Sequence, residues 1–368
     1  MLTILLVIAL VSAGCSVILL LHRKLRQAKI AAGLKLSNAR GIVTEEFVAI
    51  SGTAQWISIR GEDLRNPVML IIHGGPGCSY AIFSPHLRSW EQHFTVVQWD
   101  QPGCGKTLRR SGMSAAGPIT MERLTRDGIE LAEYLCSRLR KNRIFLLASS
   151  FGSTFGLEMA RRQPDLFHAY IGTDQNVGMV RGRNESHRHV IDALRRLGLD
   201  RGVNFLERLG PDPTRWGADE YTAAARWTMK TDPVGFRRTI KLLKDAVWFA
   251  PGWDLMDIRT FVKGMQVSCA QLLAEAVRFD AWQSGTRFEL PFLVLQGEDD
   301  VVTPAPLAAE YFNDVSAPAK HMALIRDAGH FAIILQPEQA LDHLLQHAYP
   351  LASEGEMVES RKVSSRFN

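Results

Sequence analysis

Short, uninterrupted runs of apolar residues recur along the chain and constrain its fold more than any other feature. They are VMLIIH (68–73), FTVVQW (94–99), IFLLA (144–148), AYIGT (169–173) and FLVLQ (292–296). Runs of this length without polar alternation are typical of strands buried on both faces of a parallel sheet. Helical periodicity separates them, as in the segment from Met121 to Leu139. The alternation predicts an α/β fold with a mostly parallel, doubly wound sheet.

The alternation fails between residues 176 and 289, where only helical patterns follow one another. Because strand patterns resume afterwards, we expect an inserted helical lid at 176–289 between two parts of one core, 45–175 and 290–350. The first part opens with two alternating runs around Ser51-Gly52-Thr53, a pattern typical of an antiparallel hairpin. The tail, 351–368, is polar and is expected to be disordered.

The N-terminal segment from Leu2 to Leu21 is apolar and carries no charge. About 20 such residues match the hydrocarbon thickness of a bilayer, and the positive region that opens a secretory signal is missing. A basic cluster, Arg23 to Arg40, follows. The sequence therefore predicts a transmembrane anchor over 1–22, a basic linker over 23–44 and a single-pass membrane protein whose catalytic domain faces the cytoplasm.

Charge and cysteine usage exclude several classes of function. The 368 residues carry 43 Lys and Arg against 38 Asp and Glu, and much of the basic excess lies in the N-terminal cluster. The remaining chain is nearly neutral, so no nucleic-acid partner is expected. Five cysteines show no C-x-x-C spacing, which predicts neither a disulfide framework nor a zinc site. We expect no metal and no organic cofactor.

The stretch VVQWDQPGCGKT (96–107) ends like a phosphate-binding loop. That motif needs glycine at the position of Asp100, because its backbone amides must surround the phosphates. A carboxylate there would repel the anion, and Pro102 lacks an N–H donor. The loop is therefore not interpreted as a nucleotide site.

The run IFLLASSFGSTFGLEMA (144–160) reads as a strand, a sharp turn and a helix with Ser150 at the turn. Ala148 and Gly152 give the nucleophile elbow G-x-S-x-G with alanine in place of the first glycine. Small residues are needed there because strand and helix pass close to a serine in a strained conformation. Ser150 is the predicted nucleophile.

The sequence HGGPG, starting at His73, follows an earlier strand, where the second oxyanion donor of such enzymes lies. We assign the oxyanion hole to the amides of Gly75 and Phe151, since two converging N–H groups stabilise the charge that develops on the carbonyl oxygen. His73 precedes the nucleophile in the sequence. We interpret it as a brace for the loop rather than as the general base.

An acid and a base follow the serine in the order that this arrangement requires. LVLQGEDDVVTP (293–304) supplies Asp300 just after a strand, and IRDAGH (325–330) supplies His330 after another. Asp299 and Asp174 are the alternatives for the acid, the latter at the end of the strand AYIGT.

The motifs HGGPG, WDQPGCGKT, SSFGS, GEDDVVTP and AGH, in this order, resemble the proline iminopeptidase branch of the α/β-hydrolase superfamily over roughly residues 45 to 350. The resemblance implies the α/β-hydrolase fold, Ser150 as nucleophile, Asp300 as acid and His330 as base. In that family the loop that corresponds to WDQPGCGKT reads D-Q-R-G-x-G-x-S and shapes the pocket floor. Here Pro102 replaces the arginine.

The resemblance implies a serine hydrolase that forms an acyl-enzyme on a small peptide, amide or ester. Family members hold the substrate amine with lid glutamates in a W-x-x-W-E context, but Lys230 and Thr231 stand at the last two of those positions. Strict specificity for an N-terminal proline is therefore not expected. The alternatives are a carboxylesterase or an acyltransferase on the same fold and, from another class, a non-catalytic membrane-tethered binding protein.

Overall fold

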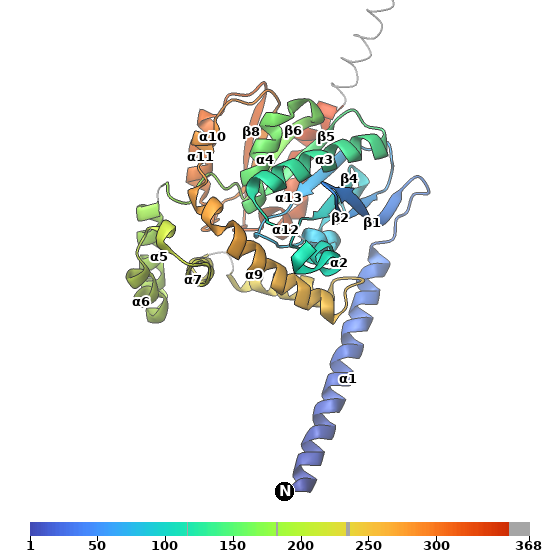
Figure 1. Cartoon of the computed structure of the whole chain (residues 1–368), viewed down its shortest axis with the longest axis vertical. Coiled ribbons are helices and arrows are strands. Elements are labelled where there is room, and N and C mark those ends of the chain that lie inside the picture. The colour runs from blue at the N-terminus through green and yellow to red at the C-terminus, as the bar shows by residue number, and fades with distance from the viewer. Residues whose placement is uncertain (116, 182, 233–235, 353–368) are drawn as a thin grey trace, which may run out of the picture.

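The computed structural model describes residues 1–115, 117–181, 183–232 and 236–352, so nearly all of the predicted disordered tail lies outside the described residues. Within them an eight-stranded sheet forms the centre of the molecule, in the order β1-β2-β4-β3-β5-β6-β7-β8 (Figure 1). The strands are β1 (Ile42–Ile50), β2 (Thr53–Gly61), β3 (Val68–Ile72), β4 (Thr95–Asp100), β5 (Ile144–Ser149), β6 (Phe167–Thr173), β7 (Phe292–Gly297) and β8 (Lys320–Ile325).

The sheet is mostly parallel, as the apolar runs predict. β1 pairs with β2 and β2 with β4 in antiparallel register, whereas every neighbouring pair from β4 through β3 to β8 is parallel. The central strands are buried along their whole length. Since parallel strands end at a common edge, the loops that follow β3, β5, β6, β7 and β8 meet at one rim of the sheet.

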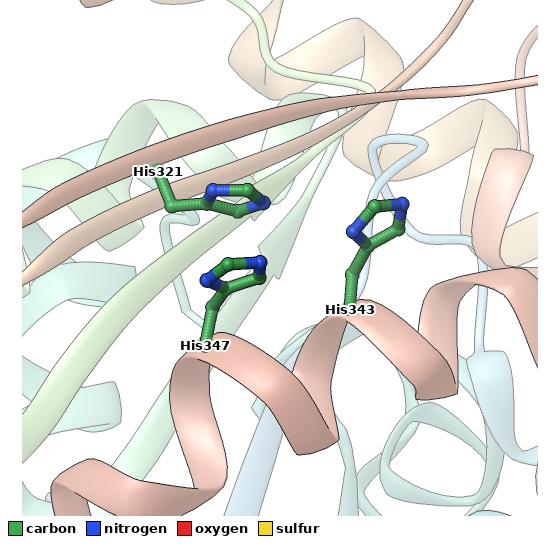
Figure 2. A group of neighbouring side chains, drawn as sticks. All are labelled: His321, His343 and His347. Atoms are coloured by element: carbon green, nitrogen blue, oxygen red, sulfur yellow. The ribbon is translucent and has the colours of Figure 1, made fainter.

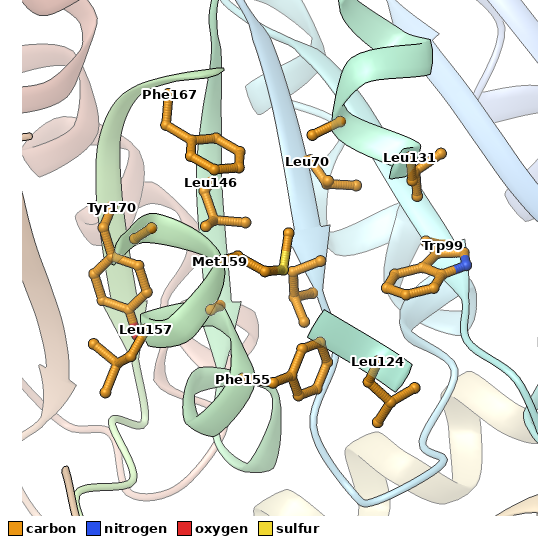
Figure 3. Close-up of a cluster of buried hydrophobic side chains, with 14 of the residues drawn as sticks. Leu70, Trp99, Leu124, Leu131, Leu146, Phe155, Leu157, Met159, Phe167 and Tyr170 are labelled. Carbon is orange, nitrogen blue, oxygen red and sulfur yellow. The ribbon is translucent and has the colours of Figure 1, made fainter. Parts of the chain in front are cut away.

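Helices cover both faces of the sheet (Figure 1). Those of the core are α2 (Gly105–Ala115), α3 (Met121–Leu139), α4 (Phe151–Arg162), α11 (Ala305–Asp314), α12 (Ala332–Leu335) and α13 (Pro337–His343), and a π-helical turn (Leu344–Ala348) continues α13. Alternate residues of each strand point to opposite faces. Leu70 and Leu146 therefore belong to the apolar cluster under α3 and α4 (Figure 3), whereas Met69 and Phe145 belong to the one under α12 and α13.

Between β6 and β7 the described chain is helical. The elements are α5 (Arg183–Arg196), α6 (Asp200–Leu209), α7 (Ala218–Met229), α8 (Phe236–Phe249), α9 (Leu255–Arg278) and the short α10 (Ala281–Ser284). α5, α6 and α7 share a small apolar cluster of their own around Leu194 and Trp216. α9 packs closely against the loop that follows β3, since a Cβ atom at Gly77 would lie 2.7 Å from the Gly264 carbonyl oxygen.

The N-terminal segment forms α1 (Leu2–Gly33), which projects from the body of the molecule (Figure 1). Of the helices described, none combines the length and apolar character needed to cross a membrane. The predicted anchor over 1–22, the membrane partner and the single-pass localisation are therefore not supported.

α1 continues past residue 22, where the sequence predicts the boundary between anchor and linker, as far as Gly33. Its second half is rich in good helix formers such as Lys, Arg, Leu, Gln and Ala. Arg23 is buried and donates to the carbonyl oxygens of Trp248 and Trp253, and Gln27 donates to that of Ala250. These contacts fix the helix against the end of α8, which the basic composition alone does not reveal.

Candidate active site

Ser150 stands at a sharp turn between β5 and α4. Its φ of 51° and ψ of −124° lie in a region that costs a non-glycine residue free energy. Close packing enforces the turn: a Cβ atom at Gly152 would lie 2.5 Å from the carbonyl oxygen of His73. One at Gly156 would lie 2.6 Å from the Cβ atom of Ala148. The small residues of the motif thus let the helix cross the strands, and the serine protrudes from the rim of the sheet.

The HGGPG loop after β3 lies directly against this serine. A Cβ atom at Gly74 would be 2.8 Å from that of Ser150, so only glycine fits there. Gly75 has a φ of 126°, which favours glycine as well. Phe151 is the first residue of α4, whose first-turn amides have no partner within the helix. Gly75 and Phe151 border the same cavity as Ser150.

His73 is buried beneath the loop. Its Nδ1 lies 2.9 Å from the Gly74 carbonyl oxygen, and its backbone oxygen accepts a hydrogen bond from Gln101 Nε2. Burial lowers the pKa of His73 to about 4, so the ring is neutral at physiological pH. His73 thus connects HGGPG to the loop after β4 through its backbone oxygen.

Asp300 lies just past β7 in a tight turn. Its Oδ1 accepts hydrogen bonds from the amides of Val302 and Thr303, at 2.8 and 2.9 Å. Its Oδ2 accepts from Thr303 Oγ1 at 2.7 Å and from Gln296 Nε2 at 3.2 Å. A carboxylate satisfied in this way is held in one orientation.

His330 joins Asp300 and Ser150. Its Nδ1 lies 2.9 Å from Asp300 Oδ2, and its Nε2 lies 3.0 Å from Ser150 Oγ. Because a carboxylate only accepts, Nδ1 donates to it, and the neutral ring presents Nε2 as an acceptor for the serine hydroxyl. Burial alone would lower the pKa of His330, but the charges of Asp300 and Asp174 outweigh it and raise the pKa to about 9. The structure therefore brings Ser150, Asp300 and His330 together in hydrogen-bond contact.

The two alternative acids have other surroundings. Asp174 Oδ1 accepts from the amide of Ala332 and its Oδ2 from Ser149 Oγ, which is 2.7 Å from the Tyr80 hydroxyl. Burial raises the pKa of Asp174 to about 6. Asp299 is only half-buried, and its amide donates to the carbonyl oxygen of Ala328. Of these carboxylates, Asp300 is the one that accepts the hydrogen bond of the His330 ring.

The loop that resembles a phosphate site holds a carboxylate where the anion would lie. Asp100 Oδ2 accepts a hydrogen bond from the amide of Lys106, and a Cβ atom at Gly105 would lie 2.1 Å from that oxygen. Lys106 Nζ forms an ion pair with Glu45, and Thr107 Oγ1 donates to the carbonyl of Asp100. The lysine and threonine thus bind groups of the protein itself.

A cavity of about 880 Å³ opens above Ser150 and His330, between the rim of the sheet and the lid. Apolar side chains make up much of its wall, among them Val177, Val247, Phe261, Leu273 and Val301. Cys78 also lines it, but burial and the charge of Asp100 raise the pKa of this thiol to about 12, which makes it a poor nucleophile.

Several residues that organise the site escape sequence reasoning. Gln296 and Thr303 hold the Asp300 carboxylate, while Tyr80 and Ser149 form a buried chain to Asp174. The threonine has a local signal, since a hydroxyl residue three positions after an aspartate often closes such a turn. The others come from different strands and loops and carry no such signal.

Residues 69–343 of the chain match the model of the alpha/beta hydrolase family. A Bacillus subtilis (strain 168) protein named "Probable aminopeptidase YbaC" is 27% identical over 317 residues, covering 84% of this chain and 97% of that protein.

Among solved structures, the proline iminopeptidase of Mycobacterium smegmatis superposes with a TM-score of 0.55 at 17% identity, covering 84% of this chain and 100% of that one. The proline iminopeptidase-related protein of Thermus thermophilus gives a TM-score of 0.54 at 21% identity, covering 84% and 99%. At these identities the superpositions show the shared fold. The family match spans most of the chain, and the chain therefore belongs to the alpha/beta hydrolase family.

Proposed function

We propose that the protein is a serine hydrolase that acts through an acyl-enzyme on a small peptide, amide or ester. The observation that carries the proposal is the continuous contact from Asp300 through His330 to the Ser150 hydroxyl. In the reaction His330 takes the serine proton as the oxygen attacks the substrate carbonyl, then gives it to the leaving group. Water, deprotonated by the same ring, releases the acid.

The amides of Gly75 and Phe151 are the proposed oxyanion hole. Both residues line the cavity beside Ser150, and the close packing at Gly74 holds the loop of Gly75 against the serine. Donors fixed in advance stabilise the developing charge without reorganisation, and one such donor is worth about 2.7–4 kcal/mol in known serine hydrolases.

The apolar wall of the cavity supports a substrate whose acyl group is apolar. One carboxylate supports an aminoacyl substrate over a simple ester. Asp232, which follows α7 in the lid, lies so close to Gly329 that a Cβ atom there would be 2.5 Å from its Oδ2. Its charge also contributes to the raised pKa of His330. A substrate ammonium bound near the imidazole would be attracted to this carboxylate.

We expect Asp232→Asn to discriminate between the two substrate classes. Removing the charge should raise KM for an aminoacyl arylamide by about tenfold, the equivalent of roughly 1.4 kcal/mol of lost attraction between the two charges. It should leave KM nearly unchanged for the matched acyl arylamide that lacks the amine. Steady-state kinetics on both substrates measure this. Equal effects on both would favour the esterase alternative.

The pH profile follows from the environment of His330. The general base must be neutral, and its pKa is raised from the ordinary 6.5 to about 9. Activity should therefore be low at acid pH and rise as the ring loses its proton. For a neutral ester, we expect kcat/KM of the free enzyme to increase through a limb above pH 6.5, as measured from about pH 5 to about pH 10. A limb centred below the ordinary value would contradict the proposed pairing with Asp300.

A panel of substrates tests the proposed reaction as a whole. Aminoacyl arylamides, p-nitrophenyl esters of increasing acyl length and short peptides should include at least one substrate that the protein hydrolyses and that Ser150→Ala does not. Added thiol or alcohol acceptors reveal acyl transfer by their acylated products. Absence of turnover across the panel would favour the non-catalytic binding protein.

A further inference from the structure

Three histidines from distant parts of the chain meet at the edge of the sheet away from Ser150. His321 is the second residue of β8, His343 ends α13, and His347 lies in the π-helical turn that follows. Figure 2 shows the ring of His321 over that of His347, with His343 beside them. Each offers a ring nitrogen, and these atoms lie within 4.8 Å of one another.

We propose that His321, His343 and His347 bind a divalent transition-metal ion such as Zn²⁺. Three imidazoles with a fourth position open to water form a frequent coordination set for this ion. The three side chains are half-buried, so solvent can reach the site and supply the fourth ligand.

Two buried nitrogens of the cluster support the proposal. Among the described residues, His321 Nε2 and His343 Nδ1 have no hydrogen-bond partner. Buried polar atoms are normally satisfied, and an unsatisfied one in a native protein calls for an explanation such as a bound ion. A metal ion would satisfy both atoms.

The cluster also favours the neutral rings that a metal requires. Burial, followed by the proximity of His347 and His343, lowers the pKa of His321 to about 4. Burial and His347 also lower the pKa of His343, although Asp342 opposes this. Near neutral pH each of these two rings is therefore uncharged and has one nitrogen with a free lone pair, as a metal ligand requires.

Binding of the ion requires the rings to change their orientation. Nitrogens bound to one tetrahedral Zn²⁺ at about 2.0–2.1 Å lie roughly 3.3 Å apart. In the structure the rings of His321 and His347 are stacked, with centroids 3.5 Å apart. Rotation about the side-chain torsions would turn their nitrogens from this stack toward a common point.

The position of the cluster keeps the ion away from the proposed hydrolytic site. His321 lies near the start of β8, whereas His330 follows the other end of that strand. At about 3.3 Å per residue, the length of β8 separates the two sites. The ion would join the edge strand to the last helix without touching the serine.

Calorimetric titration of the chelator-treated full chain with ZnCl₂ tests the proposal, and titration with Co²⁺ adds a spectroscopic readout. We expect one Zn²⁺ per chain, a visible spectrum typical of tetrahedral Co²⁺, and a higher melting temperature with Zn²⁺. His343→Gln and His347→Gln should each weaken Zn²⁺ binding by more than about 100-fold. Loss of a residue that only hydrogen-bonds to a metal ligand already costs roughly 10- to 100-fold in affinity, and loss of the ligand itself should cost more. His93→Gln, at a half-buried histidine elsewhere, should bind like the wild type.

Ester hydrolysis by the histidine variants separates this site from the serine. Both should keep wild-type activity, and their melting temperatures without metal show whether they fold. Zinc binding among Asp174, Asp300 and His330, the other described group of suitable spacing, would inhibit hydrolysis and persist in the variants. That result, or a failure of the wild type to bind Zn²⁺ and Co²⁺, would overturn the proposal.

Discussion

Ser150→Ala should lower kcat for a generic ester by roughly 10⁴- to 10⁶-fold, the range found when the nucleophile of a serine hydrolase is removed. The hydroxyl is the atom within 3.0 Å of the His330 Nε2, so alanine removes both the attacking oxygen and the proton that the base takes. Initial rates measured with p-nitrophenyl esters or aminoacyl arylamides report the loss.

Ser284→Ala is the matched control, since this exposed serine lies in α10 and its hydroxyl donates to the carbonyl of Asp280. It should keep full activity. Thermal unfolding of both variants shows whether the fold is intact. If Ser150→Ala retained wild-type turnover in a folded protein, another nucleophile would be responsible and the proposed mechanism would be wrong.

Asp300→Asn should lower kcat by about 10⁴-fold, because an amide in place of the carboxylate favours the wrong tautomer of the histidine and no longer stabilises the imidazolium. The Oδ2 atom that contacts His330 Nδ1 also accepts from Thr303 Oγ1, so the substituted side chain would keep much of its position. The same change should lower the pKa of His330, since Asp300 contributes most to raising it. The acid limb of the pH profile should shift down accordingly.

Asp174→Asn and Asp299→Asn identify the acid by contrast. Asp174 accepts hydrogen bonds from Ser149 and the Ala332 amide. Its substitution should therefore lower kcat by about tenfold, the equivalent of one hydrogen bond. Asp299 is half-buried, and its substitution should have little effect. A loss for Asp174→Asn as large as that for Asp300→Asn would mean that the two carboxylates share the role of the acid.

Sequence patterns predict the fold because the burial of each strand is visible as a short apolar run in the sequence. Strands buried on both faces must be apolar at nearly every position. β3, β5 and β7 coincide with the runs VMLIIH, IFLLA and FLVLQ, and their ends differ from those of the runs by at most a few residues. The nucleophile elbow is equally local, since close packing at Gly152 restricts that position to the smallest residue. The order of Ser150, Asp300 and His330 then follows from the topology of parallel strands.

Other features depend on contacts that no local pattern encodes. The continuation of α1 past residue 22 rests on Arg23, which binds carbonyls 225 and 230 positions away in the sequence. Asp232 reaches Gly329 only because the lid folds back over the rim. His343 and His347 are four positions apart, a spacing that two histidine ligands on one helix can have. His321 has no such relation to them in the sequence, and only the packing of the C-terminal helical segment against β8 brings the three together.

Labelling with a fluorophosphonate is the most direct test of the central claim, that His330 and Asp300 activate the Ser150 hydroxyl as a nucleophile. We expect mass spectrometry of the digested protein to find one adduct, on the peptide that contains Ser150, with labelling abolished in Ser150→Ala and strongly slowed in Asp300→Asn. An intact, folded protein that remains unlabelled, or that is labelled at another residue, would contradict the account.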